Sequence, residues 1–187
     1  MTFPDKILFG YVILMLLTEM SIIIYSQYGR YTYNVIHRYM FFEFFLFSLF
    51  IVHVVSSKKL HYCYKWILSA YVAYGMYSTI YLEPFDTFNS NLRSIENILL
   101  ILFCLMFYFN LFRKAEVVDL IKYPYFWGVS GMFIHFSGTL FIYIYAKYLD
   151  DKVSVYLWSI HSILNILLNI SIAYTLWVSS KVEKYKT

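Results

Sequence analysis

The chain has 187 residues, of which 61% are hydrophobic and only 14% charged, and its formal net charge is +4. A soluble domain of this size could not bury so much apolar surface, so the composition excludes a soluble globular protein and indicates a polytopic membrane protein. The basic residues fall mainly at the ends of apolar segments, where they act as topology signals and headgroup contacts, and nucleic acid is not expected as a partner. Cys63 and Cys104 are the only cysteines, and neither a disulfide nor a thiolate metal site is expected.

Six apolar segments follow one another along the chain, and each is long enough to cross about 30 Å of hydrocarbon as a helix. We predict an all-α fold, a bundle of six transmembrane helices that forms one membrane domain. The predicted spans are 7–25, 36–55, 64–82, 93–112, 125–148 and 153–178.

The segment boundaries depend on a few charged residues and one proline. The first segment is a predicted span and not a signal peptide, because Glu19 lies inside it and no small-x-small cleavage site is present. Lys58 and Lys59 are expected to end the second span. The third is tyrosine-rich and the weakest, and it is expected to stop at Glu83 and Pro84, where the proline would break a helix.

An even number of spans places both termini on one side of the membrane. The lysines and arginines on that side outnumber those on the other, which are Arg30, Arg38, Arg93, Lys147 and Lys152. By the positive-inside rule we expect a multi-pass protein of the cell inner membrane with both termini in the cytoplasm. The connections are short, which leaves no room for a soluble catalytic or nucleotide-binding domain.

Residues 157–177 are apolar enough to span a bilayer yet carry one ordered line of polar groups. His161, Asn165 and Asn169 recur every four residues and therefore share one face of a helix. This face needs partners or a wet cavity, so the other helices should be arranged around it. Asparagine side chains that bond across helices would give the same pattern for purely structural reasons.

Acidic residues in three other spans lie at a similar depth. From the helical rise, Glu19, Glu43 and Glu96 fall in the outer half of the membrane, with His161 at a comparable level and His135 near the midplane. Such a cluster would titrate as a coupled unit, with His161 as its cation when protonated, and it could bind a cationic or polar ligand, pass protons or only lock helices together. The candidate ligand-binding residues are therefore Glu19, Glu43, Glu96, His135, His161 and Asn165.

The individual residues also have structural explanations. Glu96 lies so near a helix start that a solvated or N-terminal helix charge accounts for it. Gly131 and Gly138 flank His135, and such a small face favours close helix packing. His37 is expected in a loop or at the lipid headgroups.

Several catalytic motifs are absent from the sequence. There is no H-E-x-x-H, no Walker loop and no G-x-G-x-x-G. A metal-dependent hydrolase needs at least three ligands and an open position; Glu19, Glu43 and His161 could supply them, but Asn165 stands where a second ligand on that helix would be useful. The sequence therefore favours a non-enzymatic function without cofactor, metal or catalytic residue.

Three long segments, SIENILLILFCLMFYFNLF, YPYFWGVSGMFIHFSGTLFIYI and LWSIHSILNILLNISIAYTLW, resemble a group of small, uncharacterised multi-pass inner-membrane proteins of Bacteroidota. LLTEMSIIIY and RYMFFEFFLFSLF fit the same group more loosely. The resemblance implies a membrane fold without an established activity. In size and hydropathy the chain is also similar to the multi-pass accessory proteins encoded beside type VI-B CRISPR effectors.

These observations favour a membrane receptor or signalling-partner module whose outer pocket binds a small ligand or senses protons. The alternatives are an oligomeric pore or defence-associated membrane effector, and an intramembrane metal-dependent hydrolase. The expected partners are the lipid bilayer and either a membrane protein or further copies of the chain.

Overall fold

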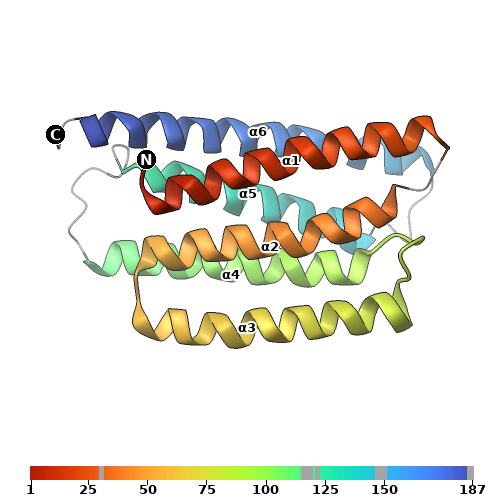
Figure 1. Ribbon diagram of the computed structural model, residues 1–187, viewed down its shortest axis with the longest axis horizontal. Helices are drawn as coiled ribbons and strands as arrows, with labels where there is room; N and C mark the ends of the chain where they lie inside the picture. Colours follow the sequence, from red (N-terminus) through yellow and green to blue (C-terminus); the bar gives the residue numbers. More distant parts are fainter. Residues whose placement is uncertain (30–31, 115–119, 121–122, 146–150, 185–187) are drawn as a thin grey trace.

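The computed structural model describes residues 1–29, 32–114, 120, 123–145 and 151–184, and every regular element within these ranges is a helix. The long helices run up and down in chain order, and both termini lie at the same end of the bundle (Figure 1). They are α1 (Phe3–Gln27), α2 (Tyr33–Val55), α3 (Lys58–Tyr77), α4 (Ser90–Lys114), α5 (Pro124–Tyr145) and α6 (Asp151–Lys184), and a π-helical turn, η1 (Ser78–Leu82), continues α3.

Five of these helices, α1, α2, α4, α5 and α6, are long and apolar enough to cross a membrane. The chain is therefore a multi-pass membrane protein, and the predicted all-α class is confirmed. The weakest predicted span corresponds to α3, which is not among the five. A crossing by α3 stays a prediction.

One of the expected boundaries changes in the structure and one is confirmed. Lys58 and Lys59 lie in the first turn of α3 and do not end α2. That helix ends at Val55, and the next residue, Ser56, has a left-handed φ of 53°. The helix that contains η1 ends at Leu82, directly before Glu83, as the proline signal predicted. The predicted end of the fifth span, and with it Lys147, lies outside the described residues, as does Arg30.

The centre of the bundle is α2. Its side chains Phe44, Phe47 and Ile51 are completely buried, in the three-to-four residue spacing of one helical face. Phe47 packs on Tyr11 of α1 with ring centroids 4.2 Å apart, and Phe44 packs on Tyr71 of α3 at 4.1 Å. A helix held between its neighbours in this way can keep a charged side chain away from lipid.

Small residues bring α5 close to α6. A Cβ atom on Gly131 would collide with the side chain of Ser171, and one on Gly138 would lie 2.6 Å from Leu164 Cδ1. The prediction that this face of the fifth span permits close helix approach is confirmed. His135 lies between these two glycines in the sequence, and its ring is 5.9 Å from that of His161 of α6.

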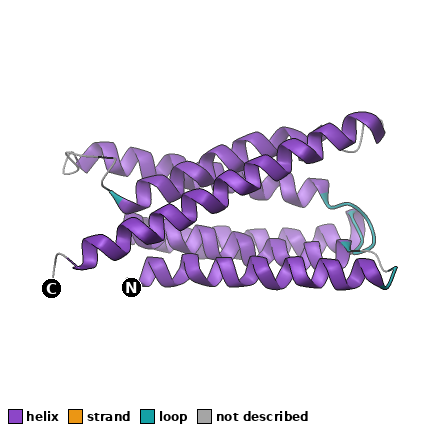
Figure 2. Ribbon diagram, turned by 90° about the horizontal axis from the view of Figure 1, so that it is seen from above, coloured by secondary structure: helices purple, strands orange, loops and turns teal. Residues whose placement is uncertain are grey.

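A polar cluster joins the two ends of the chain. Asp5 of α1 accepts hydrogen bonds from the backbone N–H of Thr2 (2.8 Å) and from the Ser179 hydroxyl of α6 (2.9 Å), and Thr2 contacts the Tyr125 hydroxyl at 2.8 Å. Away from this end, α1 and α6 diverge along the bundle (Figure 2). The two helices are therefore tied together at the end of the bundle that holds the termini.

Candidate functional site

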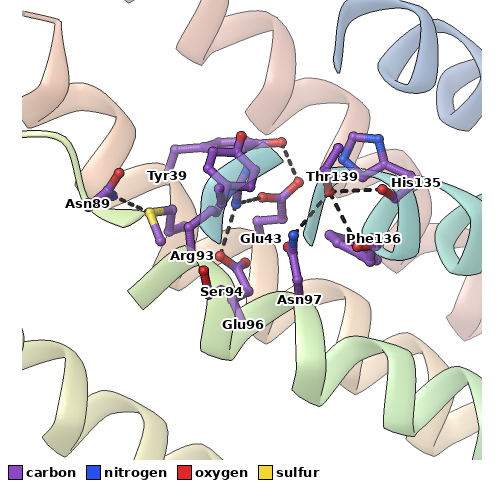
Figure 3. A network of polar contacts seen from close by, with 12 residues as sticks. Tyr39, Glu43, Asn89, Arg93, Ser94, Glu96, Asn97, His135, Phe136 and Thr139 are labelled. Atoms are coloured by element: carbon purple, nitrogen blue, oxygen red, sulfur yellow. Dashed lines mark hydrogen bonds and ion pairs between the residues drawn. The ribbon is translucent and has the colours of Figure 1, made fainter. Parts of the chain in front are cut away.

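A buried ion-pair network lies at the α2–α4 interface, in the half of the bundle away from the termini (Figure 3). The guanidinium of Arg93 contacts Glu43 of α2 through Nη1, and the same atom lies 2.9 Å from Glu96 Oε2. All three side chains are buried, and Glu96 has no exposed surface. Two carboxylates therefore share one cation inside the bundle.

The start of α4 places Arg93 and Glu96 on one face of that helix. The carboxylate of Glu83 accepts a hydrogen bond from the backbone N–H of Asn91 at 3.0 Å and another from the Ser90 hydroxyl at 3.2 Å. An acid at this position accepts hydrogen bonds from free N–H groups of the first turn, and its negative charge interacts favourably with the positive end of the helix dipole. Because the helix begins at Ser90, both Arg93 and Glu96 are helical, and side chains three residues apart lie on the same face of a helix.

Tyrosines surround the network. The Tyr39 hydroxyl donates to Glu43 Oε1 at 2.9 Å and lies 3.2 Å from the Tyr11 hydroxyl. The rings of Tyr39 and Tyr143 lie 5.9 and 5.3 Å from the Arg93 guanidinium, within the range of cation–π attraction. The orientation of Arg93 is thus fixed by aromatic rings as well as by carboxylates.

A second polar group lies on α4, α5 and α6 beside the network. Asn97 donates to the Thr139 hydroxyl at 3.0 Å, and Thr139 donates to the carbonyl of His135 at 2.8 Å. On the other side of His135 the imidazole of His161 lies 5.9 Å away, and His161 Nε2 is 2.9 Å from the Tyr143 hydroxyl. Tyr143 contacts both groups and connects the ion pairs to the histidines.

These groups face a cavity of about 150 Å³. Five of the six residues identified from the sequence line it, namely Glu19, Glu43, His135, His161 and Asn165. The sixth, Glu96, is not part of the lining and reaches the site only through Arg93. The structure thus brings side chains from α1, α2, α5 and α6 to one place, and α4 adds the arginine.

The cavity reaches the surface of the bundle beside Glu19. This side chain is exposed although it belongs to the wall, and Asn165 lines the same cavity from α6. No ion pair joins Glu19 to any described residue. Among the residues that the structure describes, the site therefore has three carboxyl groups and one guanidinium, and Glu19 is the acid without a countercharge.

The end of the cavity nearest the α3–α4 and α5–α6 connections is aromatic. The rings of Phe88 and Tyr143 stack with centroids 6.0 Å apart, and Trp158 lies edge-on to Phe88 at 5.8 Å. Trp158 also contacts the ring of His161 at 5.6 Å. Acidic groups and aromatic faces thus form the walls of the same small space.

Three sequence-based interpretations need correction. Glu96 is not a solvated helix-end charge, because it is buried against Arg93. The cation among the acids is Arg93 and not His161, which contacts Tyr143. His37 is not in a loop: it belongs to α2, is buried, and its Nε2 lies 3.2 Å from the carbonyl of Thr87.

The asparagines of α6 behave differently from one another. Asn169 donates to the carbonyl of Asn165 at 2.9 Å, within the same helix. No hydrogen bond from Asn169 to another helix is present among the described residues. The expected bonding across helices is therefore not found for Asn169, whereas Asn165 faces the cavity.

Arg93 was missed as a site residue because it was assigned to the outer flank of the fourth span. The sequence does hold a signal for it, since Arg93 and Glu96 stand three residues apart at the start of an apolar run. Within the described ranges no three His, Cys, Asp or Glu side chains are placed to hold one metal ion. Comparisons of the chain with family profiles, curated proteins and solved structures give no match.

Proposed function

We propose that the protein is a membrane receptor or signalling-partner module that binds a small cationic ligand in the cavity beside Arg93. The observation that carries the proposal is the excess of acids around the cavity: Glu43 and Glu96 share Arg93, while Glu19 at the cavity edge has no countercharge among the described residues. An ionisable residue at membrane depth is costly unless it has a partner. A cationic ligand would be that partner.

The aromatic wall favours an organic ammonium group over a bare metal ion. Phe88, Tyr143 and Trp158 present ring surfaces to the cavity, and such rings attract quaternary and alkylated ammonium groups. His161 and Asn165 add hydrogen-bonding groups on the same wall. A volume of about 150 Å³ suits a ligand with a few heavy atoms.

The topology that goes with this proposal has six spans and both termini in the cytoplasm of a bacterial cell, with the protein in the inner membrane. The cavity then lies in the outer half of the bilayer, and the ligand enters from outside the cell. The connections between the helices are short, and in this proposal the signal passes through helix contacts to a membrane-protein partner or a second copy of the chain.

Ligand binding can be tested by thermal stabilisation of the protein in detergent with a panel that includes tetramethylammonium, choline and small primary amines. At 100 times Kd a ligand adds roughly 2.7 kcal/mol to the free energy of unfolding. We expect at least one amine to raise the Tm of the wild type, and Glu19→Gln to abolish that rise. Asp86→Asn, which removes an exposed acid in the α3–α4 connection, should leave it unchanged.

Two results would contradict the proposal. One is the absence of stabilisation by any amine in the panel, and the other is equal stabilisation of wild type and Glu19→Gln. Reconstituted liposomes separate the receptor from the oligomeric pore. Release of a trapped dye by the wild type without ligand would favour the pore.

A further inference from the structure

A second cavity, of about 590 Å³, lies between α3 and α4 at the end of the bundle that holds the termini. We define it as the α3–α4 groove. Its walls are mainly apolar, and two cations and a cysteine belong to them. They include Lys59 and Cys63 of α3 and Leu102, Met106, Phe109 and Arg113 of α4.

The groove is cationic at one end and apolar along the rest of its length. Lys59 lies at the start of α3 and Arg113 at the end of α4, and both are exposed. Deeper along α4 the wall is apolar, and Leu102 and Phe109 keep 51% and 69% of their surface exposed. A ligand that fits both parts has a negative head and a hydrocarbon tail.

The dimensions match one leaflet of a bilayer. From Leu102 to Arg113 the helical rise gives a length of roughly 16 Å. Half of a hydrocarbon core of about 30 Å is nearly the same length. A chain lying in the groove would thus run from the headgroup level to the middle of the membrane.

We propose that the α3–α4 groove binds one anionic phospholipid, with its phosphate at Lys59 and Arg113 and an acyl chain along Leu102, Met106 and Phe109. No acidic side chain belongs to the described walls, so the cationic end has no countercharge within the groove. A second copy of the chain would bring the same two cations to this face, and like charges would oppose its docking. Basic pockets between transmembrane helices are suited to anionic headgroups.

The lipid would also explain how α3 is held. This helix is not apolar enough to qualify as a span by itself, and on its α4 side the groove separates the two helices. A bound acyl chain would fill that separation, and the headgroup would neutralise charges at both helix ends. This proposal does not depend on the ligand cavity beside Arg93, which lies toward the opposite end of the bundle.

Cys63 provides a native probe, since it is an exposed cysteine in the groove wall while Cys104 is buried. The rate of Cys63 alkylation by a maleimide can be measured in delipidated detergent-solubilised protein, with phosphatidylglycerol or phosphatidylcholine added at equal concentration. We expect phosphatidylglycerol to slow the reaction at least fivefold more than phosphatidylcholine. Native mass spectrometry should show one retained phosphatidylglycerol per chain.

Two double variants that each remove two positive charges test the role of the groove cations. Lys59→Gln combined with Arg113→Gln should remove the difference between the two lipids, whereas Lys58→Gln combined with Lys65→Gln, exposed positions outside the groove, should preserve it. Cys104 should stay unreactive in every variant, which reports that the fold is intact. If Cys104 were alkylated in the double variant, its fold would be disturbed. The protection of Cys63 would then be compared in the single variants Lys59→Gln and Arg113→Gln.

The proposal is overturned by equal protection from both lipids, or by protection that persists without Lys59 and Arg113. Soluble glycerol phosphate distinguishes a lipid from a free phosphate group. If glycerol phosphate protected Cys63 as well as phosphatidylglycerol, the site would recognise only phosphate and the acyl chain would have no part in binding.

Discussion

Arg93 determines the charge balance at the middle of the site. Its guanidinium contacts Glu43 and Glu96 and lies between the rings of Tyr39 and Tyr143. Buried ion pairs contribute little net stability compared with an apolar replacement of the whole group, but the loss of one partner leaves an uncompensated charge. The network therefore makes the fold depend on each of its members.

Replacement of Arg93 by leucine should therefore destabilise the protein strongly. We expect the free energy of unfolding to fall by about 3–5 kcal/mol, because two buried carboxylates lose the cation that they share. Arg93→Lys should recover part of this loss, since an ammonium keeps the charge without the planar fork. Thermal unfolding in detergent measures both variants.

The control is the triple variant Arg93→Leu, Glu43→Leu and Glu96→Leu. It removes all three charges together and should unfold at a higher temperature than Arg93→Leu alone. A triple variant no more stable than Arg93→Leu would show that packing and not charge holds this region.

The shared level of the site residues along the bundle was predictable from the sequence, and their pairing was not. The position of Glu19, Glu43 and His161 within their spans fixed a shared level, and these side chains do line one cavity. Pairing depends on which helices are neighbours and on their rotation, and no local pattern contains that information. For this reason Arg93 was assigned to a helix end, although it is buried against α2.

At the scale of the helices, glycines of α5 allow this helix to lie close to α6. Gly131 faces the Ser171 side chain, with Ser171 Oγ 2.6 Å from the position that a Cβ would occupy. Gly10 of α1 has nothing within 4 Å of such a Cβ. The two glycines form a matched pair for testing the packing.

Gly131→Ala should lower the free energy of unfolding by about 1–3 kcal/mol, because the added methyl group forces α5 and α6 apart. Gly10→Ala should be neutral or stabilising by up to about 1 kcal/mol, because alanine is the better helix former. The Tm of each variant in the same detergent checks this prediction. A second change, Ser171→Gly, should restore part of the stability of Gly131→Ala, and a failure to do so would place the clash elsewhere.

The helices themselves were largely predictable, and their exact limits less so. Apolar runs and the Glu83–Pro84 signal located all six helices. The pair Lys58 and Lys59 was misassigned because a charge pair marks a membrane edge equally well at the end of one helix and at the start of the next. The left-handed Ser56 separates the two, and serine gives little sequence signal for that conformation.

At the scale of the whole molecule, both termini lie at one end of the bundle, which makes the six-span topology testable (Figure 1). Single cysteines can be placed at Asp86, in the α3–α4 connection, and at Ser180 of α6, in a background without Cys63 and Cys104. Both positions are exposed.

An impermeant maleimide applied to intact cells should label Asp86→Cys, and Ser180→Cys should react only after the membrane is opened. This result is expected because the proposed topology of six crossings, with the termini inside, would place the two positions on opposite sides. Labelling of both positions in intact cells, or of Ser180→Cys alone, would contradict that topology.

The cluster at the chain ends has a consequence for biogenesis. The bond between Asp5 and Ser179 spans 174 positions of sequence. During synthesis α1 is made before α6, so Asp5 stays without the Ser179 hydroxyl until α6 has left the ribosome. A nascent chain stalled before α6 is complete would lack the hydrogen bond that ties α1 to α6, and this gives membrane quality-control proteases a feature that distinguishes unfinished molecules from finished ones.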